Sequence, residues 1–396
     1  MKRLYIAFLL VLPTLLLAQD WEEVSPVPDN FLTDHSFGFG IEGQGYLVTG
    51  GNFEVGRRYN NFYSYDPAED VWTRKDNFPG QPRGFAIGDI YEGKAYFGFG
   101  ASDTGERLND LWVYDPVADT WTELSPCECA SRTHPAFVIS DGVIYVGLGG
   151  GEFGNLNDWW AYDITADTWE QKAQFPALPR HHPFMFSADG YPYVGFGHGD
   201  TFISNQWYKY LPESDSWEEK ATLPAEGRVA GTQFSHNGKG YVLSGDGDDH
   251  DIMPTGEFFE YDPVEDSWTQ LTPHPGPSRW APASFIVNNE VYLINGWRNG
   301  YPSENFKYRL SEDITATDDD TRNTDALAYP NPVSSVLTLP TSLDVEKIRI
   351  STADGRVLYN SVYTDDTIDV SFLPAGAYIL ELISGRQTTI QQIVKQ

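Results

Sequence analysis

Five arginines recur at nearly equal spacing through the first three quarters of the chain. They are Arg83, Arg132, Arg180, Arg228 and Arg279, with Thr33 near the corresponding position of an earlier repeat. A guanidinium group donates bidentate hydrogen bonds to carboxylates and other anions. Two interpretations follow: the arginines either converge as a site for an anionic ligand, or they tie neighbouring structural units together.

Histidine and tryptophan side chains form a second set of candidate ligand-binding residues. They are His134, His181, His182, Trp159, Trp280 and Trp297. Exposed indole rings would stack on sugar rings, whereas buried ones would be core residues. The histidines are either ligand contacts or ordinary polar residues of loops.

The chain has two cysteines, Cys127 and Cys129. One intervening residue gives a disulfide poor geometry, although an oxidising compartment would still let the pair close. The alternative is a soft-metal site built from Cys127, Cys129 and His134.

Carboxylates gather in one short segment that contains Asp246, Asp248, Asp249 and Asp251. Alternating acids can wrap Ca²⁺, but no glutamate stands at the spacing of a calcium-binding loop. A solvated run of charge is therefore favoured, and we expect no cofactor, with Ca²⁺ bound by this segment as the alternative.

Composition and the first residues predict the compartment. The chain has 26 basic and 57 acidic residues, a net charge of −31 that disfavours nucleic acids and anionic membrane surfaces as partners. Lys2 and Arg3 precede an apolar run, so residues 1–18 are predicted to be a signal peptide. No other apolar stretch approaches the roughly 20 residues of a membrane span. We therefore expect an exported protein without a transmembrane segment.

A repeated eight-residue motif predicts the elements that position these side chains. It runs from tyrosine to tryptophan and begins at Tyr65, Tyr114, Tyr162, Tyr210 and Tyr261. One period, residues 135–169, contains short apolar runs at 136–140, 143–148 and 159–162, with an Asp-Gly hairpin turn at 141–142. Four short antiparallel strands without helical periodicity are typical of one propeller blade.

The repeats predict six such blades. A sixth unit begins at Ala283 and reaches Tyr308, but it lacks the closing tryptophan. The segment Trp21-Glu22-Glu23 matches Trp217-Glu218-Glu219 at the closing position of another unit. An N-terminal strand that completes the last blade would close the ring and cover a sheet edge.

The motif resembles the kelch repeat, which has a diglycine after its second strand, an aromatic third strand, a Tyr-Asp-Pro turn and a tryptophan. The resemblance implies an all-β fold, with a six-bladed kelch-type β-propeller over residues 19–310. Kelch repeats commonly carry an arginine between blades, which favours a structural role for the five arginines. Loops between blades and between strands two and three would share one face, where a propeller holds a ligand.

Residues 311–327 lack apolar periodicity and are predicted to be a linker. Residues 328–396 read as a small C-terminal β-sandwich. They resemble the C-terminal sorting domain of the type IX secretion system of Bacteroidota, through Tyr329–Pro332, the Asp354-Gly355 turn, Asp369–Tyr378 and Lys395. The resemblance implies that this domain engages the type IX secretion machinery and is then removed. The propeller would be secreted or attached to the outer cell surface.

Function is predicted only as a class, because no serine nucleophile, zinc-helix or phosphate-loop motif is present. The leading hypothesis is a binding module for a glycan or an extracellular protein. The alternative is a sugar-modifying enzyme similar to the sialic-acid mutarotases, in which Arg132, Arg180, Arg228 and Arg279 would hold an acidic sugar and a His or Glu would act as acid and base. An inert structural adhesin is the third class. Whether the arginines face a channel or lie in ion pairs discriminates among them.

Overall fold

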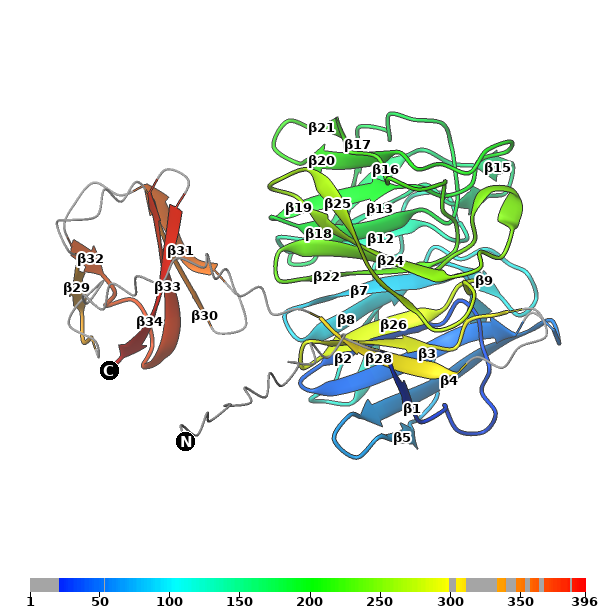
Figure 1. Ribbon diagram of the computed structural model, residues 1–396, viewed down its shortest axis with the longest axis horizontal. Coiled ribbons are helices and arrows are strands. Elements are labelled where there is room, and N and C mark those ends of the chain that lie inside the picture. Colours follow the sequence, from blue (N-terminus) through cyan, green and yellow to red (C-terminus); the bar gives the residue numbers. More distant parts are fainter. Residues whose placement is uncertain are drawn as a thin grey trace, which may run out of the picture. The chain divides into compact units, whose positions relative to one another are not determined.

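The computed structural model describes residues 21–52, 54–298, 304–310, 333–339, 347–352, 357–362, 367–384 and 387–396. The chain divides into two compact units, Met1–Ile314 and Thr315–Gln396 (Figure 1). The predicted signal peptide, the predicted linker, Tyr329–Pro332 and the Asp354-Gly355 turn lie outside the described residues. Within the described residues, no helix has the length and apolar character needed to cross a membrane.

Antiparallel sheets build the described part of the first unit. Two sheets are β2 (Phe37–Ile41), β3 (Gln44–Asn52), β4 (Arg57–Asp66) and β5 (Val71–Arg74), extended by β6 (Arg83–Gly84) and β9 (Ala101–Ser102), and β7 (Ile87–Tyr91), β8 (Lys94–Gly98), β10 (Leu111–Asp115) and β11 (Thr120–Leu124). Two more are β12 (Ala136–Ser140), β13 (Val143–Gly147), β16 (Trp159–Asp163) and β17 (Thr168–Lys172), and β18 (Phe184–Ala188), β19 (Tyr191–Gly195), β20 (Trp207–Leu211) and β21 (Ser216–Lys220). A fifth sheet is β22 (Thr232–His236), β23 (Lys239–Leu243), β24 (Gly256–Asp262) and β25 (Ser267–His274), and a sixth is β26 (Ala283–Val287), β27 (Glu290–Ile294), β28 (Asn305–Arg309) and β1 (Glu22–Val24). The described part also contains a short two-stranded sheet, β14 (Gly150–Gly151) with β15 (Gly154–Asn155), and a 3-10 turn, η1 (Asp248–His250). We name these six sheets by their inner strands, as the β2, β7, β12, β18, β22 and β26 sheets.

The predicted strands of the third period are confirmed. β12 pairs with β13, β13 with β16 and β16 with β17, all antiparallel. Asp141 and Gly142 have φ angles of 48° and 78°, the left-handed conformation that a tight two-residue hairpin requires. All five residues of β12 are buried, because this strand is covered on both faces.

The inner strands of the six sheets contact one another in cyclic order: β2 with β7, β7 with β12, β12 with β18, β18 with β22, β22 with β26, and β26 with β2. Glycine permits the last of these contacts. A Cβ atom on Gly40 would lie 1.9 Å from the carbonyl oxygen of Ile286, so the backbones of β2 and β26 approach more closely than a side chain would allow. β1 pairs with β28, and thereby joins the start of the described chain to the β26 sheet.

The repeated motif makes the same internal bond in five sheets. Its tyrosine hydroxyl donates to an aspartate five residues later at 2.5–2.7 Å. The pairs are Tyr65–Asp70, Tyr114–Asp119, Tyr162–Asp167, Tyr210–Asp215 and Tyr261–Asp266.

The aspartate and tryptophan of the motif together hold one backbone residue of the preceding sheet. Trp169 Nε1 donates to the carbonyl of Ser125 at 2.9 Å, and Asp167 accepts from the N–H of Ser125 at 3.1 Å. The same arrangement recurs for Trp72 and Asp70 on Ser25, Trp217 and Asp215 on Ala173, and Trp268 and Asp266 on Ala221. In these four sheets the motif therefore fastens the sheet to its predecessor, which explains much of its recurrence.

This clamp predicts a pH-dependent effect of Asp167→Asn. Hydrogen bonds from the Tyr162 hydroxyl and from Ser125 hold the pKa of Asp167 below its ordinary value. The carboxylate therefore stabilises the fold at pH values above the unfolded pKa of about 4, and this stabilisation is lost as the pH falls through the lower folded pKa. We expect the variant to melt below the parent at pH 7 and to converge with it in acid.

Asparagine is a suitable replacement, because position 167 has a φ of 53° and asparagine adopts the left-handed conformation readily. Scanning calorimetry of parent and variant between pH 3 and 7 makes the comparison. A difference between their melting temperatures that does not change with pH contradicts the role of the ionised carboxylate.

The second unit contains two sheets in its described residues. One pairs β29 (Val336–Thr338) with β32 (Thr367–Asp369), and the other orders β31 (Val357–Val362), β30 (Lys347–Thr352), β33 (Gly376–Ser384) and β34 (Gln387–Lys395). Side chains from both sheets, including Leu337, Ile368, Ile350 and Leu380, belong to one buried cluster. The two sheets therefore share a hydrophobic core.

Candidate functional site

A repeated three-residue segment precedes each inner strand. Its members are Thr33–His35, Arg83–Phe85, Arg132–His134, Arg180–His182, Arg228–Ala230 and Arg279–Ala281. We call the third residue of each segment a ring residue: His35, Phe85, His134, His182, Ala230 and Ala281. All six have positive φ, between 46° and 64°. Backbone hydrogen bonds link neighbours, with His134 N–H donating to Phe85 and His182 N–H to His134.

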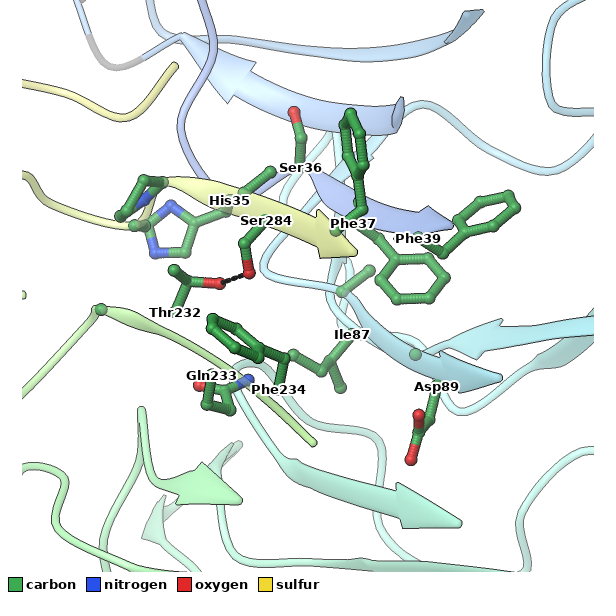
Figure 2. Close-up of a pocket in the computed structure, with 18 of the residues that line it drawn as sticks. His35, Ser36, Phe37, Phe39, Ile87, Asp89, Thr232, Gln233, Phe234 and Ser284 are labelled. Carbon is green, nitrogen blue, oxygen red and sulfur yellow. Dashed lines mark hydrogen bonds between the residues drawn. The ribbon is translucent and has the colours of Figure 1, made fainter. Parts of the chain in front are cut away.

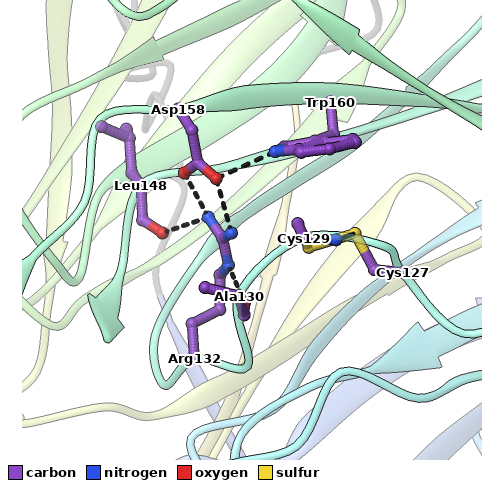
Figure 3. Close-up of polar contacts among 7 residues, drawn as sticks. All are labelled: Cys127, Cys129, Ala130, Arg132, Leu148, Asp158 and Trp160. Carbon is purple, nitrogen blue, oxygen red and sulfur yellow. Dashed lines mark hydrogen bonds and ion pairs between the residues drawn. A yellow bond between two sulfur atoms is a disulfide. The ribbon is translucent and has the colours of Figure 1, made fainter. Parts of the chain in front are cut away.

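The arginines that open five of these segments are buried and bonded within the protein. Arg132 donates to both carboxylate oxygens of Asp158 at 2.6 and 2.8 Å, and to the carbonyls of Leu148 and Ala130 (Figure 3). Arg83 makes the same bidentate pair with Asp110. In both cases the carboxylate belongs to the sheet whose inner strand follows the arginine.

The other three arginines have weaker or different partners. Arg228 bonds Glu257 at 2.6 Å, whereas Arg180 has Gln206 and backbone carbonyls. Arg279 donates to the carbonyls of Asn295 and Glu304. Burial lowers the pKa of Arg180 and that of Arg279 to about 10. These placements favour the structural interpretation of all five arginines.

A cavity of about 360 Å³ lies inside the ring of inner strands. Its lining comes from the six ring residues and from β2, β7, β22 and β26. Aromatic side chains such as Phe37, Phe39 and Phe234 line it together with polar ones such as Gln233 (Figure 2). Thr232 and Ser284 hydrogen-bond across two sheets at 2.6 Å in its wall.

Three of the ring residues are histidines whose side chains meet. The ring nitrogens of His35, His134 and His182 that could ligate an ion lie within 4.8 Å of one another. His35 Nε2 is 3.0 Å from His182 Nε2, and His35 Nδ1 is 2.6 Å from a carboxylate oxygen of Asp34. Burial lowers the pKa of His134 and of His182 well below the ordinary value, and neighbouring histidines lower it further.

Further predicted site residues surround this group. The His181 ring lies beside the rings of His182 and His134. The ring centroid of His198 is 4.9 Å from that of His181 and 4.5 Å from that of His250. Trp280 lies 5.1 Å from His182 between ring centroids. Trp280 and Trp297 pair through two backbone hydrogen bonds, and both indoles are partly buried. Trp159 is fully buried and is therefore a core residue.

The described carboxylates of the predicted calcium segment do not belong to a group that could hold a metal ion. Asp246 is buried and accepts a bond from Ser278, and burial raises its pKa to about 6. Asp248 and Asp251 are exposed. The side chain of Asp249 lies outside the described residues. The metal-capable group found among the described side chains is the histidine group instead.

The predicted soft-metal set is wrong. Cys127 and Cys129 form a disulfide with each other (Figure 3), and both are buried in the core shared with Phe137. Their sulfur atoms are therefore not available to ligate an ion beside His134.

Two contributors to the site, His35 and the inner-strand aromatics, were absent from the sequence prediction. Thr33 stands at the arginine position of the first repeat, so His35 stands two residues after it, as His134 does after Arg132 and His182 after Arg180. Counting forward from Thr33 would have found His35. The aromatics read as ordinary apolar strand residues, and nothing local distinguishes a cavity wall from a packed core.

Comparisons with known proteins agree with this architecture. The model of the KLHDC2/KLHL20/DRC7 Kelch-repeats domain matches residues 16–175. The model of the Secretion system C-terminal sorting domain matches residues 327–396.

Two individual proteins are similar over part of the chain. Beta-agarase D of Zobellia galactanivorans is 30% identical over 137 residues, which are 33% of this chain and 28% of the agarase. The chain thus spans less than a third of that relative. The structure of YjhT covers 61% of this chain and 84% of its own, with a TM-score of 0.51 and 14% identity, a likeness of fold alone. The chain is therefore an exported kelch-repeat β-propeller protein that carries a type IX secretion C-terminal sorting domain.

Proposed function

We propose that residues 19–310 form a closed six-bladed propeller in which β1 completes the last blade. The cyclic contacts of the inner strands and the pairing of β1 with β28 support this. Residues 328–396 would form a small β-sandwich that directs export through the type IX secretion system. The propeller then acts outside the cell, secreted or held at the surface, after the signal peptide and the sorting domain are removed.

Outside the cell, the propeller acts as a binding module for a carbohydrate. The observation that carries this proposal is the cavity of about 360 Å³, within the size range of small-molecule sites. Aromatic rings and a few polar groups line it, a combination that suits the apolar faces and hydroxyl groups of a sugar. The partial similarity to a protein named beta-agarase adds support from sequence.

Binding is favoured over the alternative of a mutarotase-like enzyme. In that alternative, an acidic sugar would be bound by Arg132, Arg180, Arg228 and Arg279. Each of these guanidinium groups is buried and bonded to protein acceptors. Releasing a buried arginine from its partners costs more free energy than one sugar carboxylate returns.

Thermal unfolding with a panel of neutral and acidic oligosaccharides tests the proposal. A ligand at a hundred times its Kd stabilises the folded state by about 2.7 kcal/mol, which raises the melting temperature by several degrees. We expect a shift with at least one sugar, and its loss in Gln233→Ala and Phe234→Ala, which alter the cavity wall.

Gln171→Ala and Phe153→Ala are the matched controls, because both residues are exposed and neither lines the cavity. They should keep the full shift. The absence of a shift with every sugar, or a shift equal in all five proteins, would sink the carbohydrate proposal and leave extracellular proteins as the class of ligand.

A further inference from the structure

We propose that His35, His134 and His182 form a binding site for a divalent transition-metal ion of the zinc or copper class, at the end of the central cavity. Imidazole is a preferred ligand of these ions. The site goes beyond carbohydrate binding and does not depend on it, because the three histidines alone supply the ligands.

The separations among the nitrogens suit such an ion. Zinc–nitrogen bonds of about 2.0–2.1 Å in a tetrahedral site place two ligand nitrogens roughly 3.4 Å apart. His35 Nε2 and His182 Nε2 are 3.0 Å apart, and all three candidate ligand atoms lie within 4.8 Å. Small side-chain rotations bring the third nitrogen to bonding distance.

Buried nitrogens without hydrogen-bond partners provide an independent observation. Neither ring nitrogen of His134 has a partner, and Nδ1 of His182 has none. Buried polar atoms in native proteins are nearly always paired, and an unpaired one costs free energy. A bound cation would take up the lone pair of one His134 nitrogen.

A carboxylate orients the third histidine. Asp34 lies 2.6 Å from Nδ1 of His35 and is itself buried. A carboxylate at Nδ1 fixes the proton there and leaves the lone pair on Nε2, the atom that faces His182. Two backbone hydrogen bonds between Asp34 and Gly51 fix the backbone that carries this carboxylate. Metal-ligating histidines usually have such a partner.

The fold does not require histidine at these positions. The other ring residues, Phe85, Ala230 and Ala281, have the same left-handed backbone and precede equivalent strands. The loop therefore forms equally well with phenylalanine or alanine. The three histidine side chains meet across the ring, and their residue type is explained by what these side chains do together.

A titration of the purified full-length chain, stripped with EDTA and dialysed, tests the site with Zn²⁺ alone. Calorimetry should give one tightly bound ion per chain. Co²⁺ in its place should produce the visible absorption of a low-coordinate nitrogen site. We expect His35→Ala and His134→Ala each to weaken binding at least about 100-fold, and Asp34→Asn to weaken it about 10- to 100-fold.

The controls exploit the repeat. Alanine at position 134 reproduces Ala230 and Ala281, so the variant should fold, and His134→Phe reproduces Phe85 as a second test. His236→Ala removes a histidine outside the group and should bind as the parent does. Absence of stoichiometric binding in the parent overturns the proposal. Binding that survives His134→Ala and His134→Phe but is lost in His198→Ala or His250→Ala also overturns it. No sugar enters these titrations, so they are independent of the carbohydrate result.

Discussion

Arg132→Met is expected to lower the free energy of unfolding by about 3–5 kcal/mol, the usual cost of removing one partner from a buried ion pair. The Arg132 side chain is fully buried, and its terminal nitrogens bond both oxygens of Asp158 (Figure 3). In the variant, Asp158 keeps only the indole N–H of Trp160, and the carbonyls of Leu148 and Ala130 lose their donor. Denaturant unfolding of parent and variant measures the loss.

Two comparisons separate the buried charge from a general effect of substitution. Lys94→Met removes an exposed pair with Asp115 and should cost at most about 1 kcal/mol. Arg180→Met leaves no carboxylate unpaired, because its partners are Gln206 and backbone carbonyls, so its cost should be smaller than that of Arg132→Met.

The double variant Arg132→Met/Asp158→Leu completes the comparison. It should recover part of the stability lost in the single variant, because no charge is left buried without a partner. An Arg132→Met variant as stable as Lys94→Met would contradict the structural role of the arginines and would return them to consideration as ligand-binding residues.

The repeat could be recognised in the sequence because its tyrosine and aspartate form the same bond in five sheets and its tryptophan forms the same backbone bond in four of them. Tyr162 bonds Asp167 five residues away, and Trp169 bonds the backbone of the preceding sheet. Residues that form the same bonds in successive sheets recur at nearly equal intervals in the sequence. The strand order, the hairpins and the pairing of β1 with the last unit all follow from that pattern.

The candidate site could not be recognised in the sequence, because its members occupy equivalent positions of the repeats but differ in residue type. His35, Phe85 and Ala230 occupy equivalent places, and no chemical pattern connects them along the chain. What joins His35 to His182 is closure of the ring, which brings together residues 147 positions apart. The partners of the arginines are similarly remote, although Asp110 and Asp158 each stand two residues before a tryptophan of the third strand. That recurrence could have identified them.

Removal of the segment that contains Trp21–Val24 is expected to destabilise the propeller strongly. Val24 is buried, and Trp21 packs against Phe258 and Tyr308 while its indole donates to the carbonyl of Thr272. Burial of these two side chains contributes about 3 kcal/mol or more. A chain that begins at Ser25 should therefore melt roughly 5–10 °C below one that begins at Gln19. Scanning calorimetry measures the difference.

The truncation also exposes the edge of β28, whose N–H and C=O groups pair with β1 in the complete chain. An unpaired edge recruits another strand, so sedimentation velocity should show self-association of the truncated chain. A synthetic peptide of residues 19–28 should restore both the melting temperature and the monomer, whereas the same peptide with Trp21→Ala and Val24→Asp should restore neither. An unchanged melting temperature in the truncated chain would mean that the ring is held closed without β1. Rescue by the unaltered peptide, but not by the altered one, would mean that pairing of β1 with β28 keeps the ring of sheets closed.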